Sequence, residues 1–130
     1  MNDIKHIEIK GSGYLTGEHG QYLWASLTPN DTAIGLIDTD SSIGYLMVHR
    51  GKNPQTIDEL SLQFVNDIGN RHIDPRIKTY ALASQKNLQT LDKYFRIDNH
   101  DVLSGACENV EFYVRAPDSD KGFSVMSIGL

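Results

Sequence analysis

The stretch AIGLIDTDSSIGYLMVH, residues 33–49, decides the fold of this chain. It contains two almost wholly apolar runs, Ala33 to Ile37 and Ile43 to His49. Apolar runs of this length that are bounded by turn residues are typical of buried strands. The segment between them, Asp38 to Ser42, is rich in the side chains that favour turns. The stretch therefore predicts a hairpin of two buried strands, with His49 at the end of the second.

Further short elements are predicted on both sides of this hairpin. Alternating or short apolar runs indicate strands at 7–9, 22–27, 77–83, 110–114 and 123–128. Apolar side chains at helical spacing predict a helix over 57–68, and a second helix with an apolar face at Leu88, Leu91 and Phe95. Strands, helix, strand, helix and strands follow one another along the chain. This order predicts a mixed α/β sandwich with two main helices, as one domain over residues 1–130.

The starts of both helices carry capping signals. Thr56 to Glu59 has the form of a capping box, in which the threonine side chain accepts from the backbone N–H three residues on. Ser84 stands just ahead of the second helix and is a good N-cap residue. The sequence therefore predicts Thr56 and Ser84 as the two helix caps.

The composition and charge of the chain indicate which partners and which compartment to expect. The 130 residues carry 12 basic and 17 acidic side chains, for a net charge of −5, and the basic residues fall singly. An acidic surface repels phosphate backbones, so no nucleic-acid partner is expected. No apolar run approaches the roughly 18 residues of a membrane-spanning helix. Residues 1–10 contain no signal-peptide core, so the expected compartment is the cytoplasm.

A few residues have side chains that could carry chemistry. His49 ends a strand, Asp31 stands close to the same hairpin, and Cys107 is the one cysteine of the chain. A satisfied structural histidine and turn-forming carboxylates are the favoured interpretations of His49 and of the aspartates. A single cysteine excludes an internal disulfide, and the histidines lack metal-ligand spacing. Neither a metal nor another cofactor is therefore expected.

Several segments, taken in order, match the pattern of a known family. They are Gly11-Ser12-Gly13, Leu36-Ile37-Asp38, Ile43 to His49, the helix to Ile68, Asn87 at the second helix, and Asp101 to Phe112. In this order and spacing the chain resembles the chemoreceptor glutamine deamidase family, CheD, over most of its length. The resemblance implies the fold of that family. For an intact member it also implies a hydrolase of chemotaxis that uses a cysteine and a histidine.

The resemblance places the family's histidine on His49 but leaves its cysteine without a counterpart. Counting along the first hairpin strand puts the cysteine position on Asp31, or on Thr32 if an extra turn residue is ignored. The family's threonine falls on Ala25, and Cys107 falls on a glycine position. Deamidation by this route needs a thiolate that attacks the side-chain amide. The resemblance therefore implies the fold and argues against the activity.

Three functions remain open. The favoured one is a CheD-like protein without deamidase chemistry, a pseudoenzyme that binds another protein. The second is a divergent amide hydrolase, with His49 as general base, Asp31 as its acid or orienting partner and Thr32 as nucleophile. In the third, Cys107 reaches His49 or His100 across the fold and forms a new thiol site.

A protein-binding module should expose an apolar patch. The candidates are Tyr14, Leu15, Tyr22 and Trp24, which lie near the glycine-rich segment at the start of the chain. The identity of the partner and the oligomeric state are not encoded in any motif. The expected partner class is therefore a protein, with no further specification.

Overall fold

The computed structural model describes residues 6–68, 77–103, 110–118 and 123–129, and within them the chain forms nine strands and two helices. The strands are β1 (His6–Glu8), β2 (Gly13–Glu18), β3 (Tyr22–Leu27), β4 (Thr32–Asp38), β5 (Ile43–His49), β6 (Ile77–Ala83), β7 (Asn99–Val102), β8 (Val110–Asp118) and β9 (Phe123–Gly129). The helices are α1 (Pro54–Asp67) and α2 (Gln85–Leu91). This is the mixed α/β class that the sequence predicts.

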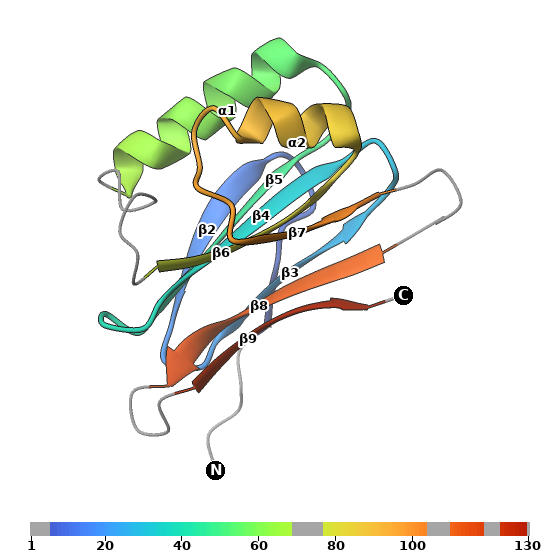
Figure 1. The fold of residues 1–130 in the computed structure, drawn as a ribbon. Coiled ribbons are helices and arrows are strands. Elements are labelled where there is room, and N and C mark those ends of the chain that lie inside the picture. Colours follow the sequence, from blue (N-terminus) through green and yellow to red (C-terminus); the bar gives the residue numbers. More distant parts are fainter. Residues whose placement is uncertain (1–5, 69–76, 104–109, 119–122, 130) are drawn as a thin grey trace.

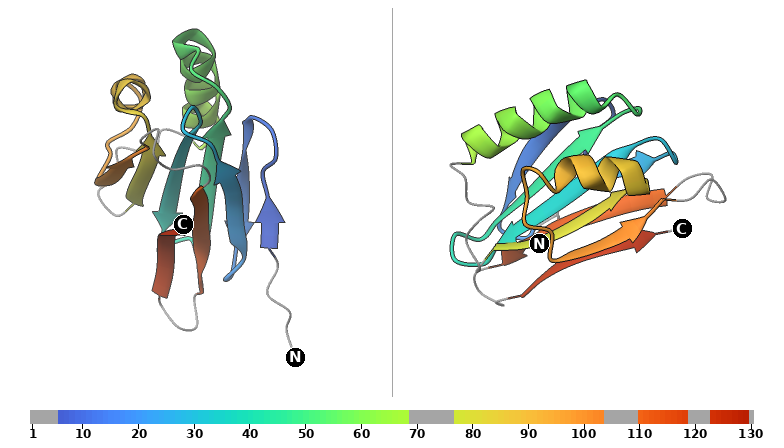
Figure 2. Two further views of the ribbon diagram at one scale, coloured as in Figure 1. Left: turned by 90° about the vertical axis from the view of Figure 1, so that its right-hand side faces the viewer. Right: turned by 45° about the horizontal axis from the view of Figure 1, so that its top comes forward.

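The strands form two sheets. Sheet A has the strand order β1-β3-β8-β9, and sheet B has the order β2-β5-β4-β6-β7. Both sheets are mixed, because β1 pairs with β3 and β6 pairs with β7 in parallel, while the other pairs are antiparallel. Both helices lie over one face of sheet B, and sheet A lies on its other side (Figures 1 and 2). The predicted sandwich is therefore confirmed, with three layers.

The predicted hairpin is confirmed as β4 and β5, and β4 is the central strand of sheet B. All seven residues of β4 are buried. Side chains alternate between the faces of a strand. Ile34 and Leu36 therefore join the core under the helices, whereas Ala33 and Ile37 join the core between the two sheets. Burial on both faces explains why this part of the sequence is continuously apolar rather than alternating.

The first helix begins earlier than the capping box predicts. Helix α1 starts at Pro54, and its N-cap is Asn53, whose side chain accepts from the backbone N–H of Gln55 at 3.0 Å. Asparagine is a strong N-cap and proline suits the first helical position, so this pair outcompetes the threonine. The prediction that Thr56 caps the helix is therefore wrong. The prediction for α2 is confirmed, since Ser84 accepts from the backbone N–H of Asn87.

The two sheets come close together at Gly44, in β5. A Cβ atom at this position would lie 3.1 Å from the Cα of Ala116 and 3.3 Å from its backbone nitrogen. Ala116 belongs to β8 of sheet A. Backbone atoms cannot rotate away as a flexible side chain can, so a larger residue would force the sheets apart.

Replacement of Gly44 by alanine should therefore lower the free energy of unfolding by about 1–3 kcal/mol, the usual cost of overpacking. Urea denaturation of the purified chain measures this value. Gly11→Ala is the matched control, because a Cβ there meets no atom within 4 Å. Its expected effect is within about 0.5 kcal/mol. Equal losses in the two variants would contradict this account of sheet packing.

Candidate functional site

Asp31 closes the connection between β3 and β4. Its backbone N–H donates to the carbonyl of Thr28 at 2.9 Å, which is the hydrogen bond of a four-residue turn. Its carboxylate Oδ2 accepts from the Thr28 N–H at 2.8 Å and from the Thr28 hydroxyl at 3.1 Å. Pro29 stands at the second position of this turn, where its fixed φ is favoured. The turn therefore holds the carboxylate in one place.

Arg50 is the ion-pair partner of Asp31. Its Nη1 donates to Asp31 Oδ2 at 2.9 Å and to the carbonyl of Ser26 at 2.6 Å, while Nη2 donates to the carbonyl of Ile9 at 3.0 Å. The N–H of Gly51 also donates to Asp31 Oδ1, at 3.2 Å. We call this set of contacts the Asp31–Arg50 junction. It joins the end of β5 in sheet B to the chain at β1 and β3 in sheet A.

Asp31 is ionised at neutral pH. Its burial would by itself raise the pKa, because a charge loses its hydration. The hydrogen bonds from the backbone of Thr28, from Arg50, from the backbone of Gly51 and from the Thr28 hydroxyl outweigh burial and lower the pKa of Asp31 below 3.8. A carboxylate held in this way is a poor proton donor near neutral pH.

A second group of polar side chains lies on the helix side of sheet B. We call Thr32, His49, Thr56 and Asn87 the polar cluster. Thr32 and His49 are directly opposite each other on β4 and β5. Asn87 Nδ2, from α2, donates to Thr32 Oγ1 at 2.9 Å, and His49 Nε2 lies 2.6 Å from Thr56 Oγ1, in α1. The cluster therefore links the first turns of both helices to the hairpin.

The two ring nitrogens of His49 have different surroundings. Nε2 shares a hydrogen bond with the Thr56 hydroxyl, which also donates to the carbonyl of Asn53 at 3.1 Å. Nδ1 is buried and lies outside hydrogen-bond geometry with the described residues. Burial lowers the pKa of His49 below 6.5, although the Gly51 backbone and the Asp31 charge act in the opposite direction. His49 is therefore neutral at pH 7.

The neighbouring residues Asp31 and Thr32 serve different sides of the molecule. Asp31 takes its hydrogen bonds from Thr28, Arg50 and Gly51, and none from His49. Thr32 contacts α2 and stands opposite His49. Of the two positions that the resemblance allows for the cysteine, Thr32 is thus the one that faces the histidine.

The side chains that the resemblance singles out are buried, whereas Thr56 of the polar cluster is exposed and Arg50 of the junction is partly exposed. Thr32 is 0% exposed, His49 4% and Asp31 5%. A nucleophile or general base has to reach its substrate at a cleft. The pocket described below, between α2 and β7, includes none of these three residues. In the described part of the chain, no three histidine, cysteine, aspartate or glutamate side chains form a group that could hold a metal ion. Cys107 lies outside the described residues.

The expected surface patch is divided between three places. Tyr14 packs against Phe64 with ring centroids 5.0 Å apart, and its hydroxyl donates to Asp67 of α1. Leu15 packs against the core between the sheets. Tyr22 and Trp24 lie on the outer face of sheet A, since the residues between and after them on β3 are the buried ones. Both side chains of this last pair are half-buried on that face.

Residues of β8 extend that surface. Trp24 stacks with Tyr113, its cross-strand partner, with ring centroids 5.9 Å apart and an interplanar angle of 19°. The guanidinium of Arg115 lies 5.5 Å from the centre of the Tyr22 ring. We call Tyr22, Trp24, Tyr113 and Arg115 the aromatic face. Both helices lie on the far side of sheet B, so no described helix covers it (Figure 1).

Sequence reasoning missed the residues that complete these sites. Arg50 directly follows His49, but nothing in the local pattern marks it as the partner of a carboxylate 19 residues away. The resemblance does single out Asn87, at the start of the second helix. It does not indicate that Asn87 hydrogen-bonds to Thr32. Thr56 was assigned to a helix cap rather than to the histidine.

Comparisons with known proteins leave the function to be inferred from the chain itself. No model of a known protein family matches the sequence, and a search of curated proteins gives no match. Neither of the helices in the described residues is long and apolar enough to cross a membrane. The geometry of the sites above is therefore what bears on function.

The low pKa of Asp31 predicts a loss of stability in acid. A folded-state pKa below the unfolded value makes the junction fully stabilising above about pH 4, and this stabilisation is lost as the pH falls through the folded-state pKa. Asp31→Asn should lower the free energy of unfolding at pH 7 by about 2–4 kcal/mol. The difference from the wild type should shrink as the pH falls below about 4. Urea denaturation across this range measures it, with Glu59→Gln as an exposed control. A difference that stays constant with pH would contradict the stabilising role of ionised Asp31.

The low pKa of His49 predicts a second, separate pH window. The unfolded chain binds a proton to this histidine near pH 6.5, whereas the folded chain resists it, so stability falls as the pH drops below 6.5 until the folded-state pKa is reached. His49→Gln should remove this slope while keeping an N–H donor for Thr56. Thermal denaturation at a series of pH values tests this. His100→Gln is the control, since His100 is exposed and its loss should leave the slope unchanged. A slope that survives in His49→Gln would contradict the prediction.

Proposed function

We propose that this chain is a CheD-like domain that has lost deamidase chemistry and binds another protein through the aromatic face. The observation that carries the proposal is the outer face of sheet A, where the half-buried side chains of Tyr22, Trp24, Tyr113 and Arg115 lie together. Tryptophan, tyrosine and arginine are the residue types that contribute most binding energy in protein interfaces. Their clustering on one sheet face supports a protein as the ligand.

The aromatic face is also ordered before any partner arrives. The Tyr113 hydroxyl donates to Glu111 at 2.6 Å, and this hydrogen bond raises the pKa of Tyr113 so that the hydroxyl keeps its proton. Trp24 stacks on the same ring, and Arg115 lies over Tyr22. Side chains that are already held in place lose less conformational entropy on binding. This arrangement favours recognition of a partner surface without large rearrangement.

The interior of the hairpin supports the loss of chemistry. Deamidation through a covalent intermediate needs an accessible nucleophile beside a base. Thr32 faces His49, but its hydroxyl is buried and accepts from Asn87. Asp31 is held by Arg50, Thr28 and Gly51. These side chains carry structural hydrogen bonds in place of a reaction.

A second candidate function is the divergent amide hydrolase. The observation in its favour is that Thr32 stands opposite His49, whose pKa is lowered by burial, so that the ring is available as a base. It requires an opening motion that brings Thr32 to a substrate. Asp31 would act there through its charge on His49, and not as a hydrogen-bonded partner. The hydrolase would convert a side-chain amide of the bound protein to a carboxylate, whereas the binding module would leave the bound protein unmodified.

Photo-crosslinking should capture the partner at the aromatic face. The full chain carries p-benzoylphenylalanine in place of Tyr113 in its native host, and mass spectrometry identifies the adduct. One discrete protein is expected. The same probe in place of Glu59, an exposed residue of α1, is the control and should not give this adduct.

Binding of the purified partner then tests the surface by titration calorimetry. Trp24→Ala and Arg115→Ala should each weaken the affinity at least about tenfold, as expected for hot-spot residues. Leu62→Ala should not, although Leu62 is the most exposed large apolar residue of the described chain, at 51%. Equal affinities for all variants would refute the aromatic face as the binding surface. Conversion of partner glutamine to glutamate, dependent on His49, would replace the proposal by the hydrolase.

A further inference from the structure

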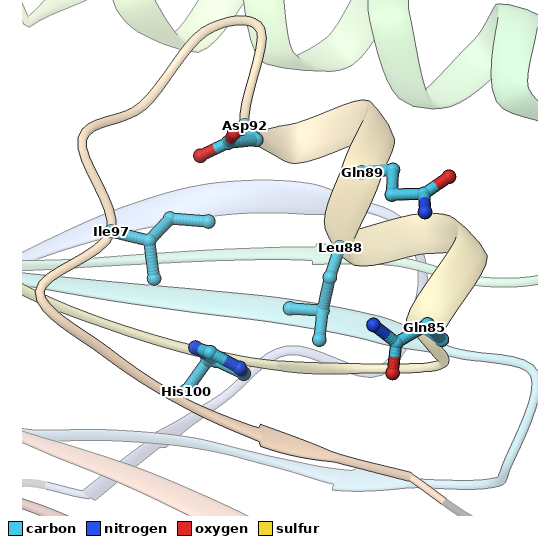
Figure 3. Close-up of a pocket in the computed structure, with 6 residues that line it drawn as sticks. All are labelled: Gln85, Leu88, Gln89, Asp92, Ile97 and His100. Atoms are coloured by element: carbon cyan, nitrogen blue, oxygen red, sulfur yellow. The ribbon is translucent and has the colours of Figure 1, made fainter.

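A cavity of about 260 Å³ lies between α2 and β7. Leu88 projects from α2 toward the strand, where His100 lies below it, and Ile97 comes from the connection between the two elements (Figure 3). Gln85, Gln89 and Asp92 from α2 complete its lining. Clefts that hold whole small-molecule ligands are mostly about 300–1,000 Å³. The size of this cavity instead suits a single side chain.

The edge of sheet B borders this cavity. Among the described residues, β7 is the last strand of the sheet and pairs with β6 alone, in parallel. All four of its residues, Asn99 to Val102, are exposed, and Val102 is 47% exposed. Sheet edges are often protected by lysine or proline, and β7 has neither. Its outer backbone groups are therefore suited to pair with another extended segment.

The lining of the cavity selects the chemistry of an incoming side chain. Leu88 and Ile97 can contact a stem of methylene groups, while Asp92 supplies a carboxylate and Gln85 supplies an amide oxygen. An apolar side chain would contact Leu88 and Ile97 but would make no use of these exposed acceptors. Lysine and arginine combine an apolar stem with a cationic donor group. They fit both parts of the lining.

The charges around the cavity favour a cation as well. Three cations lie close to the cavity in sequence, Lys86, Lys93 and Arg96, and none of them lines it. Arg96 lies 3.5 Å from Asp98 and Lys93 lies 3.8 Å from Asp58. Among the described residues Asp92 has no such ion pair, and the whole chain carries a net charge of −5. An acidic segment would be repelled here, and a basic one attracted.

We propose that β7 and this cavity bind an extended segment of a protein that carries a lysine or an arginine. The segment adds to sheet B as a further strand beside β7. Every second side chain of an added strand points to the helix side, so one of them reaches the cavity next to His100. The site is separate from the aromatic face, and the inference does not depend on a partner there.

A peptide titration tests the site. The probe is the pentapeptide Thr-Val-Lys-Val-Thr, acetylated and amidated, added to the isotope-labelled full chain and followed by NMR. Backbone amide shifts should move in residues 99–102 and around Leu88. Replacement of the peptide lysine by glutamine should weaken binding about threefold to fivefold, the effect of losing one exposed charge pair. Replacement by glutamate should abolish it.

Variants of the chain locate the charge. Asp92→Asn should weaken binding of the lysine peptide by the same factor, about threefold to fivefold. It should leave binding of the glutamine peptide unchanged. Glu59→Gln is the matched control, since it removes one exposed negative charge from α1, and should change neither. No shift in residues 99–102 at about 5 mM peptide, enough for a millimolar site, would overturn the proposal. So would equal binding of the lysine, glutamine and glutamate peptides. Shifts confined to the aromatic face would overturn this site while leaving the proposed function intact.

Discussion

The ion pair between Asp31 and Arg50 is the contact on which the arrangement of the two sheets depends. Arg50 follows the last residue of β5 and reaches the carbonyls of Ser26 and Ile9, which belong to the chain of sheet A. Asp31 in turn ties Arg50 to the turn that leads into β4. A partly buried arginine with several fixed acceptors has few alternative positions. The end of the hairpin that carries His49 is therefore held by this pair.

This constraint bears directly on function. The resemblance offers two positions for a catalytic cysteine, and the fold uses one of them, Asp31, to join the sheets. The other, Thr32, stands opposite His49, and its hydroxyl accepts a hydrogen bond from Asn87 of α2. Asp31 and Thr32 each make contacts of their own, so neither position needs a thiol to keep the scaffold intact. Recognition then passes to surfaces outside the hairpin, which is what we propose for the aromatic face.

The signals that predicted the fold correctly are local. The apolar runs of β4 and β5 and the Ser84 cap each depend on residues close in sequence. The sites depend on pairings that no local pattern encodes. Trp24 meets Tyr113 only because β3 pairs with β8, and Arg50 meets Asp31 across the end of a sheet. Thr56 shows the same limit, since a local capping signal was overruled by Asn53 and by the histidine.

A double-mutant cycle on the central ion pair tests the account most directly. The free energy of unfolding would be measured in urea at pH 7 for the wild type, Asp31→Asn, Arg50→Met and the double variant. We expect a coupling energy of at least about 1.5 kcal/mol, as for residues that share one hydrogen-bond network. Effects that add within about 0.5 kcal/mol would contradict the account. Asp31 would then be free of its structural role, and the catalytic position that the resemblance offers it would again call for a chemical explanation.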